Sequence, residues 1–307
     1  MSLEKSLFEL DYWYVDISSK KIKIPGTVIL ENKNKKEFYE LNDLEINELS
    51  KALVYSANKI KDGYFKEKEE SYNLIITNNP YKEKRYFVPF RKPSTYKVPS
   101  DGCLFCYLAK LGKPSRYNYP DDIYSYVLDY FDDFFVILNV FPYSFGNVMI
   151  IPNEHKRSIS EIGYENTYKM LKIAKEWLLK INNLFYKKGK PIYVVYANVG
   201  QNSGRSIEHF HLQITIFSKK QFENFNFDWI FNDRTAFLDK MFEVIMQNKN
   251  DFKILYGMNF LESRKSYVKA ILVPRYRQIA GLELAELYPF NEEIEETVKK
   301  FKSFVNL

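Results

Sequence analysis

Histidine, cysteine, glycine and proline are all scarce in this chain. Its 307 residues include 3 histidines, 2 cysteines, 11 glycines and 12 prolines. Two cysteines cannot form a disulfide framework for so long a chain, so a reducing, cytoplasmic setting is expected. No segment has the biased composition of disorder or of a fibrous protein. The longest apolar runs, such as Val148–Ile151, have the length of a strand, and the N-terminus lacks a signal-peptide pattern, so no membrane segment is expected.

What the chain does contain is enough apolar and aromatic surface for a large core. Hydrophobic residues make up 46%, with 25 Tyr and 25 Phe, which suits one large domain or two of ordinary size. The net charge of +6 comes from lysines interleaved with acidic residues. That pattern favours a solvated surface over a nucleic-acid footprint, and it also suits a phosphate-bearing small molecule.

A weak internal repeat runs through the first two thirds of the chain. Each copy contains two strand-like runs, an amphipathic helix and a further strand. The helices are indicated by apolar residues at steps of three and four, from Ile46 to Ile60 and from Tyr164 to Ile181. Short turns between the strands predict antiparallel pairing. The expected strands are 11–16, 25–30 and 72–77 in the first copy, and 133–138, 145–151 and 192–197 in the second.

A linker, two further helices and two further strands are expected in the remaining segments. Residues 91–102 contain two prolines and a glycine among polar residues and are the best linker candidate. Residues 228–247 predict a helix, and 252–256 and 267–273 predict strands. A closing amphipathic helix is expected at 291–304. The domains expected are 1–95, 98–220 and 221–307, the last packing on the first.

The histidines and cysteines fall in patterns that indicate chemistry. His209 and His211 lie two apart in an expected strand 209–217, so with Gln213 they would project from one face, roughly 7 Å apart in succession. Cys103, Cys106, His155 and His209 together would complete a closed tetrahedral zinc site, and iron suits the same ligands. His211 would then be available for another role.

The loop before the histidines has the composition of a phosphate-binding loop. Gly200 and Gly204 allow backbone N–H groups to approach an anion, and Ser206 can donate its hydroxyl to the same group. Arg205 lies inside this loop and is a candidate substrate contact.

These motifs resemble the histidine triad superfamily. The His-x-His-x-Gln form at 209–213 is similar to the transferase branch, which includes galactose-1-phosphate uridylyltransferases and diadenosine tetraphosphate phosphorylases. The resemblance spans about 101–217 and joins the CxxC pair, the segment 139–155 and the segment 198–213 in the order found in the superfamily. It implies an α+β, histidine-triad-like fold of antiparallel sheets with packed helices, arranged as tandem degenerate and active halves.

The resemblance also implies roles for individual residues. His211 would attack the α-phosphorus of a nucleotide, forming a covalent nucleotidyl-histidine intermediate. Gln213 would donate an amide N–H to a phosphoryl oxygen, and Ser206 with the loop amides would stabilise the transferring phosphate. Asn139 matches a ribose contact and Asn198 a phosphate contact.

The same resemblance supports a structural metal and shows where this chain departs from the family. In uridylyltransferases the counterparts of Cys103, Cys106, His155 and His209 hold zinc. Phe210 stands where many uridylyltransferases have proline, and Asn147 replaces a histidine of the hydrolases. The first repeat has no histidine, and its segment 86–90 stands near the place of a catalytic strand, so this half is expected to be degenerate.

The function expected is nucleotidyl transfer in the cytoplasm. The donor would be a nucleoside diphosphate sugar or dinucleoside polyphosphate, and the acceptor a sugar 1-phosphate or phosphate. One alternative is a hydrolase of the same fold. Another, of a different class, is a zinc-containing nucleic-acid-binding protein, against which Ser206, His211 and Gln213 argue. The protein is expected to be a monomer with an internal pseudo-dimer, or a homodimer.

Overall fold

A computed structural model describes most of the regular core of the chain. The residues described are 10–16, 27–64, 70–78, 86–89, 102–111, 126–139, 146–185, 192–203, 205, 207–217, 234–247, 269–274 and 287–290. The expected strand at 252–256, the closing helix at 291–304 and nearly all of the linker at 91–102 lie outside them. None of the described helices is long and apolar enough to cross a membrane.

One antiparallel sheet dominates the described part of the chain. Its nine strands follow the order β1-β2-β10-β3-β8-β9-β7-β6-β5, and every neighbouring pair is antiparallel. The strands are β1 (Trp13–Asp16), β2 (Val28–Asn32), β3 (Tyr72–Thr77), β5 (Val127–Tyr130), β6 (Phe134–Leu138), β7 (Val148–Pro152), β8 (Ile192–Val199), β9 (Leu212–Phe217) and β10 (Lys269–Pro274). The predicted α+β fold with antiparallel pairing and packed helices is confirmed.

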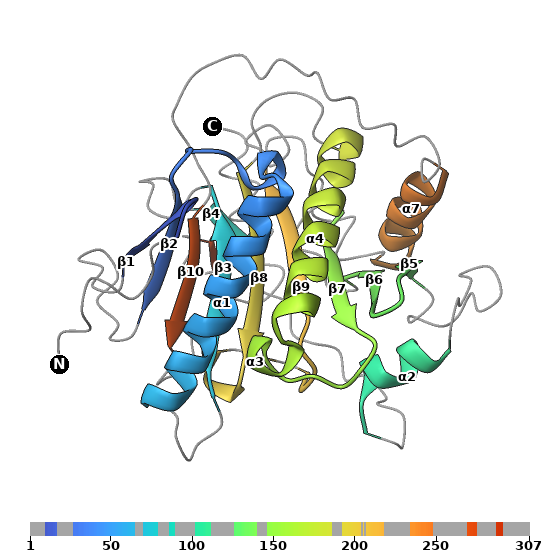
Figure 1. Cartoon of the computed structure of the whole chain (residues 1–307). Coiled ribbons are helices and arrows are strands. Elements are labelled where there is room, and N and C mark those ends of the chain that lie inside the picture. Colours follow the sequence, from blue (N-terminus) through green and yellow to red (C-terminus); the bar gives the residue numbers. More distant parts are fainter. Residues whose placement is uncertain are drawn as a thin grey trace.

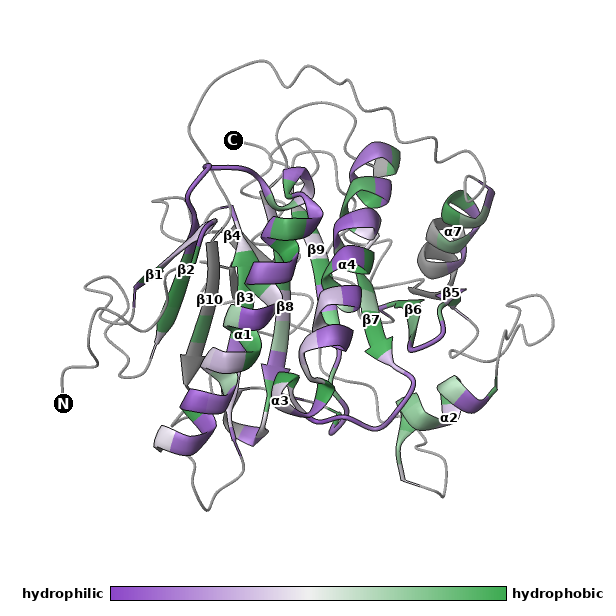
Figure 2. Cartoon of the chain, in the orientation of Figure 1, coloured by the Kyte–Doolittle hydropathy of each residue, from purple (hydrophilic) through white to green (hydrophobic). Residues whose placement is uncertain are grey.

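Two long helices cover one face of this sheet (Figure 1). They are α1 (Asp43–Tyr64) and α4 (Tyr164–Phe185), and they contact each other. Their apolar stripes include Leu49, Leu53, Leu171 and Leu178, all fully or almost fully buried. Figure 2 shows the resulting alternation of hydrophobic and hydrophilic bands along both helices. The short α3 (Ile159–Ile162) precedes α4, while α2 (Leu104–Lys110) and α7 (Arg234–Gln247) lie toward the β5 edge.

The two halves are related by a constant offset of 121 positions. Helices α1 and α4 both have 22 residues and begin at Asp43 and Tyr164, which differ by 121. Each half also carries a fully buried tyrosine that reaches the other half. The hydroxyl of Tyr193 accepts a hydrogen bond from the N–H of Phe38 (2.9 Å), and that of Tyr72 accepts from the N–H of Ile159 (3.2 Å). Both pairs repeat the same offset, so the internal repeat is structural.

The C-terminal part of the chain completes the first half. Strand β10 lies between β2 and β3, just as β9 lies between β7 and β8. Ile271 of β10 is opposite Ile75, while Gln213 of β9 is opposite Tyr196, the residue 121 positions after Ile75. Ile271 therefore occupies in the first half the position that Gln213 has in the second.

This arrangement corrects the expectation that 86–90 stands near the place of a catalytic strand. Residues Tyr86–Pro89 form β4, which pairs in parallel with β11 (Leu287–Phe290) in a separate two-stranded sheet. The local sequence pattern could not predict that β10, and not β4, lies beside β3, because β10 is almost 200 residues away from β3 in sequence. A smaller difference is that β9 begins at Leu212, so His209 and His211 precede the strand. The elements α2, α3, β5 and β11 were not predicted.

Candidate functional site

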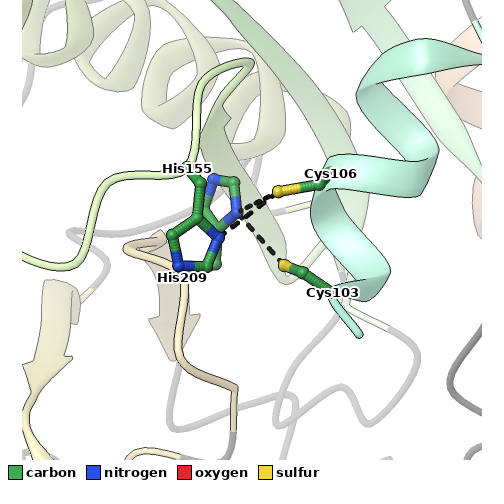
Figure 3. A group of neighbouring side chains, drawn as sticks. All are labelled: Cys103, Cys106, His155 and His209. Atoms are coloured by element: carbon green, nitrogen blue, oxygen red, sulfur yellow. Dashed lines mark hydrogen bonds between the residues drawn. The ribbon is translucent and has the colours of Figure 1, made fainter. Parts of the chain in front are cut away.

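A cluster of two thiols and two imidazoles forms at one end of the second half (Figure 3). Cys103 is the N-cap of α2 and Cys106 lies in its first turn. His155 follows β7, and His209 lies just before β9. The four potential ligand atoms are within 4.8 Å of one another.

The spacing of these atoms fits a tetrahedral metal. Sγ of Cys103 is 3.4 Å from Nδ1 of His209, and Sγ of Cys106 is 3.3 Å from Nδ1 of His155 and 3.5 Å from that of His209. Zinc bonded to sulfur and nitrogen at its usual lengths would separate these atoms by about 3.6 Å. The residues present therefore match the donor set and geometry of a closed site.

The ring of His209 is oriented by a backbone carbonyl. Its Nε2–H donates to the oxygen of Pro152 at 2.9 Å, which leaves Nδ1 facing the sulfur atoms. Such an outer hydrogen bond is the usual support of a metal-ligating histidine. Burial lowers the pKa of His209 to about 4, although the bond to Pro152 acts in the opposite direction. The ring is therefore neutral near pH 7.

His211 is held in one orientation by the residue two positions before it. It is 5% exposed, and its Nδ1–H donates to the carbonyl of His209 at 2.8 Å. That assignment leaves Nε2 unprotonated, with its lone pair directed away from the backbone. Burial lowers the pKa of His211, and the positive charge of Arg205 lowers it further. Arg205 therefore lies within electrostatic reach of His211, and it is partly buried.

The aromatic ring of Phe105 packs against both histidines. Its centroid lies 5.7 Å from that of His209 and 5.4 Å from that of His211, with edge-to-face geometry in each case. Phe105 lies in α2, between the two cysteines. The cluster of potential ligands and His211 thus share one packing partner.

Gln213 is fixed by two donors that converge on its oxygen. Oε1 accepts from Nδ2 of Asn139 at 3.0 Å and from the hydroxyl of Tyr196 at 2.9 Å. With the oxygen so engaged, the Nε2 end of the amide is the end that can donate to a ligand. Asn139 was expected beside a ribose, and here its amide braces Gln213. Tyr196 was missed because its partner depends on the pairing of β8 with β9.

The loop after β8 is anchored on the first half. Nδ2 of Asn73 in β3 donates to Oδ1 of Asn198 (2.7 Å) and to the carbonyl of Ser203 (3.1 Å). Gly200 adopts φ +76°, and a Cβ there would lie 2.1 Å from the carbonyl oxygen of Glu70. Only glycine fits this position. Of the other expected loop residues, Gly204 and Ser206 lie outside the described part of the chain.

Asn147 has a structural role. Its side chain is completely buried, and its amide nitrogen donates to the carbonyl of Ile214 (2.8 Å) and to the hydroxyl of Thr215 (3.0 Å). These contacts tie the start of β7 to β9. The residue that replaces the histidine of the hydrolases therefore supports the strand that carries Gln213.

Comparisons with known proteins found similar sequences and similar solved structures. An uncharacterised HIT-like protein of Borreliella burgdorferi is 26% identical over 115 residues, covering 36% of this chain and 73% of that protein. A uridylyltransferase structure aligns with a TM-score of 0.44 and 11% identity, covering 72% of this chain and 75% of its own. An ADP-glucose phosphorylase from Arabidopsis thaliana aligns with the same TM-score and 12% identity, covering 72% and 73%.

The family profile described as the HIT domain matches residues 121–218. That span contains β5 to β9, His155, the histidine pair and Gln213. The match agrees with the histidine triad motifs in the sequence and with the antiparallel fold. Residues 121–218 of this chain are therefore similar to the HIT domain, and the rest of the chain lies outside that match.

Proposed function

We propose that this protein is a nucleotidyltransferase that works through a covalent nucleotidyl intermediate on Nε2 of His211. The observation that carries the proposal is the bond from Nδ1 of His211 to the carbonyl of His209, 2.8 Å long. It fixes the tautomer and the direction of the remaining lone pair before any substrate binds. A neutral, oriented imidazole is a competent nucleophile near pH 7.

The reaction consists of two displacements at the α-phosphorus. In the first, Nε2 of His211 forms a P–N bond, and the P–O bond to the leaving phosphate group breaks with its electron pair on oxygen. In the second, an acceptor phosphate oxygen forms a P–O bond, and the P–N pair returns to Nε2. Phosphate groups at neutral pH need not lose a proton to attack, so no separate general base is required.

The surrounding polar groups would stabilise the charge that moves during both steps. The amide nitrogen of Gln213 donates to a phosphoryl oxygen, while the guanidinium of Arg205 neutralises charge on the phosphate chain. Asn198, Gly200, Gly204 and Ser206 form the loop that receives the phosphate. Asn139 contributes by bracing Gln213 and stands where the ribose is expected.

The cysteine and histidine cluster would hold a structural zinc ion, and iron suits the same donors. Cys103, Cys106, His155 and His209 fill all four positions, so the ion would offer no open site for substrate. When bound, the metal would link α2 to the segments around β7 and β9, and it would take no part in the reaction itself. It would thereby hold the backbone carbonyl on which His211 depends.

The donor class expected is a nucleoside diphosphate sugar or a dinucleoside polyphosphate, and the acceptor a sugar 1-phosphate or inorganic phosphate. Use of water as acceptor would instead make the protein a hydrolase of the same fold.

The test is to incubate the protein with UDP-glucose, ADP-glucose and diadenosine tetraphosphate separately, without acceptor, and to measure the intact mass. A productive donor should add one nucleoside monophosphate, acid-labile and alkali-stable as a phosphoramidate. Steady-state kinetics should be ping-pong. His211→Ala should lose both adduct and turnover while keeping the metal, whereas His209→Ala should lose the metal first. Undiminished turnover in His211→Ala would exclude this mechanism.

A further inference from the structure

Tyr196 lies in the middle of β8, directly opposite Gln213 in the ladder with β9. It is 1% exposed, and its hydroxyl donates to Oε1 of Gln213 at 2.9 Å. Alternate residues of β8, including Tyr193 and Val195, belong to the core under the helices, whereas Tyr196 does not. Its side chain therefore projects from the other face of the sheet, toward Gln213.

The hydroxyl of Tyr196 and the amide of Asn139 both favour one orientation of the Gln213 amide. Both are donors directed at the same atom, Oε1. Rotating the amide by 180° would place its NH2 group against the NH2 group of Asn139, and the hydroxyl of Tyr196 would have to turn from donor to acceptor, so the present orientation makes the better set of buried hydrogen bonds. The donor orientation of Gln213 is therefore favoured before substrate arrives.

We propose that Tyr196 is a positioning residue that selects a phosphate acceptor over water by holding Gln213 in its donor orientation. The proposal rests on the nucleotidyl-histidine mechanism and adds the residue that controls the fate of the intermediate. Tyr196 acts through Gln213, with no contact to the reacting atoms required.

The physical basis is the difference between the two acceptors. An attacking phosphate is anionic and is attracted by an N–H donor beside the phosphoryl group, and it returns the electron pair of the P–N bond to His211 without losing a proton. Water forms the same new P–O bond but must lose a proton to solvent. A Gln213 turned with its oxygen toward the site would repel the anion and accept a hydrogen bond from that water. The orientation of the Gln213 amide thus decides whether phosphate or water takes the nucleotidyl group.

The experiment measures how the nucleotidyl group is divided between phosphate and water in the whole chain. The donor that labels His211 is supplied with inorganic phosphate as the probe acceptor, and the ratio of nucleoside diphosphate to nucleoside monophosphate is determined. In Tyr196→Phe, which removes only the hydroxyl, we expect the ratio to fall by about 3- to 10-fold, the change in an equilibrium that a typical hydrogen bond produces.

Tyr193→Phe is the matched control. Tyr193 lies in the same strand and is also buried, but its hydroxyl bonds Glu37 (2.9 Å) and the N–H of Phe38 (2.9 Å) on the helix side. This variant should lose stability without changing the product ratio. An equal fall of the ratio in both variants would show a general effect of losing a buried hydroxyl and would overturn the proposal.

A second comparison tests whether Tyr196 acts through Gln213. In a Gln213→Ala background, Tyr196→Phe should leave the product ratio unchanged, because the group it orients is gone. A further fall there would overturn the proposal. An unchanged ratio in the single Tyr196→Phe variant would also overturn it, while the wild-type adduct on His211 would still support nucleotidyl transfer. Absence of that wild-type adduct would instead reject the proposed function.

Discussion

Two carboxamide side chains at the site, those of Asn198 and Gln213, accept hydrogen bonds through their oxygen atoms from buried donors. Asn73 donates to Asn198, and Asn139 and Tyr196 donate to Gln213. In each case the acceptor end of the amide is engaged by the protein, which orients the donor end. Neutral donors placed in this way can bind phosphoryl oxygens without exchanging a proton.

Gln213→His tests the neutral amide at the residue scale. An imidazole at this position can exchange protons and can assist water, so the rate without acceptor should rise relative to the rate with inorganic phosphate. Product formation with and without phosphate measures this ratio. Wild-type protein should turn over donor much faster with phosphate. Equal wild-type rates under both conditions would favour the hydrolase instead.

Gly200→Ala tests the close approach of the loop after β8 to the first half. The new Cβ would meet the carbonyl oxygen of Glu70 at 2.1 Å and Cα of Ser71 at 2.8 Å, in a backbone with φ +76°. Strain and overpacking together should cost about 2–5 kcal/mol, measured by denaturant unfolding, and donor labelling should slow.

Gly163→Ala is the control for that substitution. Gly163 has a similar φ of +77°, but nothing lies within 4 Å of its Cβ position. Its ψ of 175° lies in a region essentially limited to glycine, so Gly163→Ala should cost about 1–3 kcal/mol from backbone strain alone, less than Gly200→Ala. Equal losses in the two variants would show that contact with Glu70 and Ser71 is unimportant.

At the scale of elements, helix α2 depends on what surrounds it. It has 7 residues, fewer than an isolated helix needs in water. Leu104, Phe105 and Leu108 are buried beneath it, and its two cysteines face the histidines. Packing and the proposed metal therefore hold this helix in place, and with it the ring of Phe105 that contacts His211.

Cys106→Ser should remove the metal and lower thermal stability. Wild-type protein purified without added metal should contain about one equivalent of zinc or iron by elemental analysis, since structural sites bind tightly. The variant should contain much less and should melt several degrees lower. Leu111→Ser, at the exposed end of α2, should keep both properties. A stable wild-type protein without metal would contradict the metal proposal.

At the scale of the whole molecule, the half without histidines supports the half that has them. Strands β3 and β8 join the two halves at the centre of the sheet. Asn73 of β3 reaches the loop after β8, while Thr77 at the other end of β3 donates to the carbonyl of Tyr193 at 2.8 Å. The junction of β3 and β8 therefore contacts the site at the Asn73 end and lies away from it at the Thr77 end.

Asn73→Leu should weaken both stability and donor binding. The substitution removes the hydrogen bonds to Oδ1 of Asn198 and to the carbonyl of Ser203, which costs about 1–3 kcal/mol. It also lets the loop shift, so the donor KM should rise about tenfold with a smaller change in kcat. Thr77→Val removes a buried hydrogen bond at the other end of the same strand. It should lower the free energy of unfolding by about 1 kcal/mol and leave KM unchanged. Equal KM changes in both variants would contradict a specific role for Asn73.

Local periodicity in the sequence determined much of the fold. The apolar steps of three and four located α1 and α4, and the strand-like runs located β3, β6 and β8 within a few residues. These elements bury continuous stripes, and burial imposes the period directly. The four residues of the thiol and imidazole cluster were also recognisable, because the chain contains so few histidines and cysteines that their grouping is informative.

Tertiary structure alone decided which distant segments became neighbours. Strand β10 enters the first half from residues 269–274, and β4 is diverted to another sheet, because strand pairing depends on the whole core and leaves no local pattern. For the same reason Tyr196 and Asn73 were not recognised as site residues. Their importance comes from the atoms opposite them, Oε1 of Gln213 and Oδ1 of Asn198, and only the pairing of β3, β8 and β9 brings those atoms within hydrogen-bond distance.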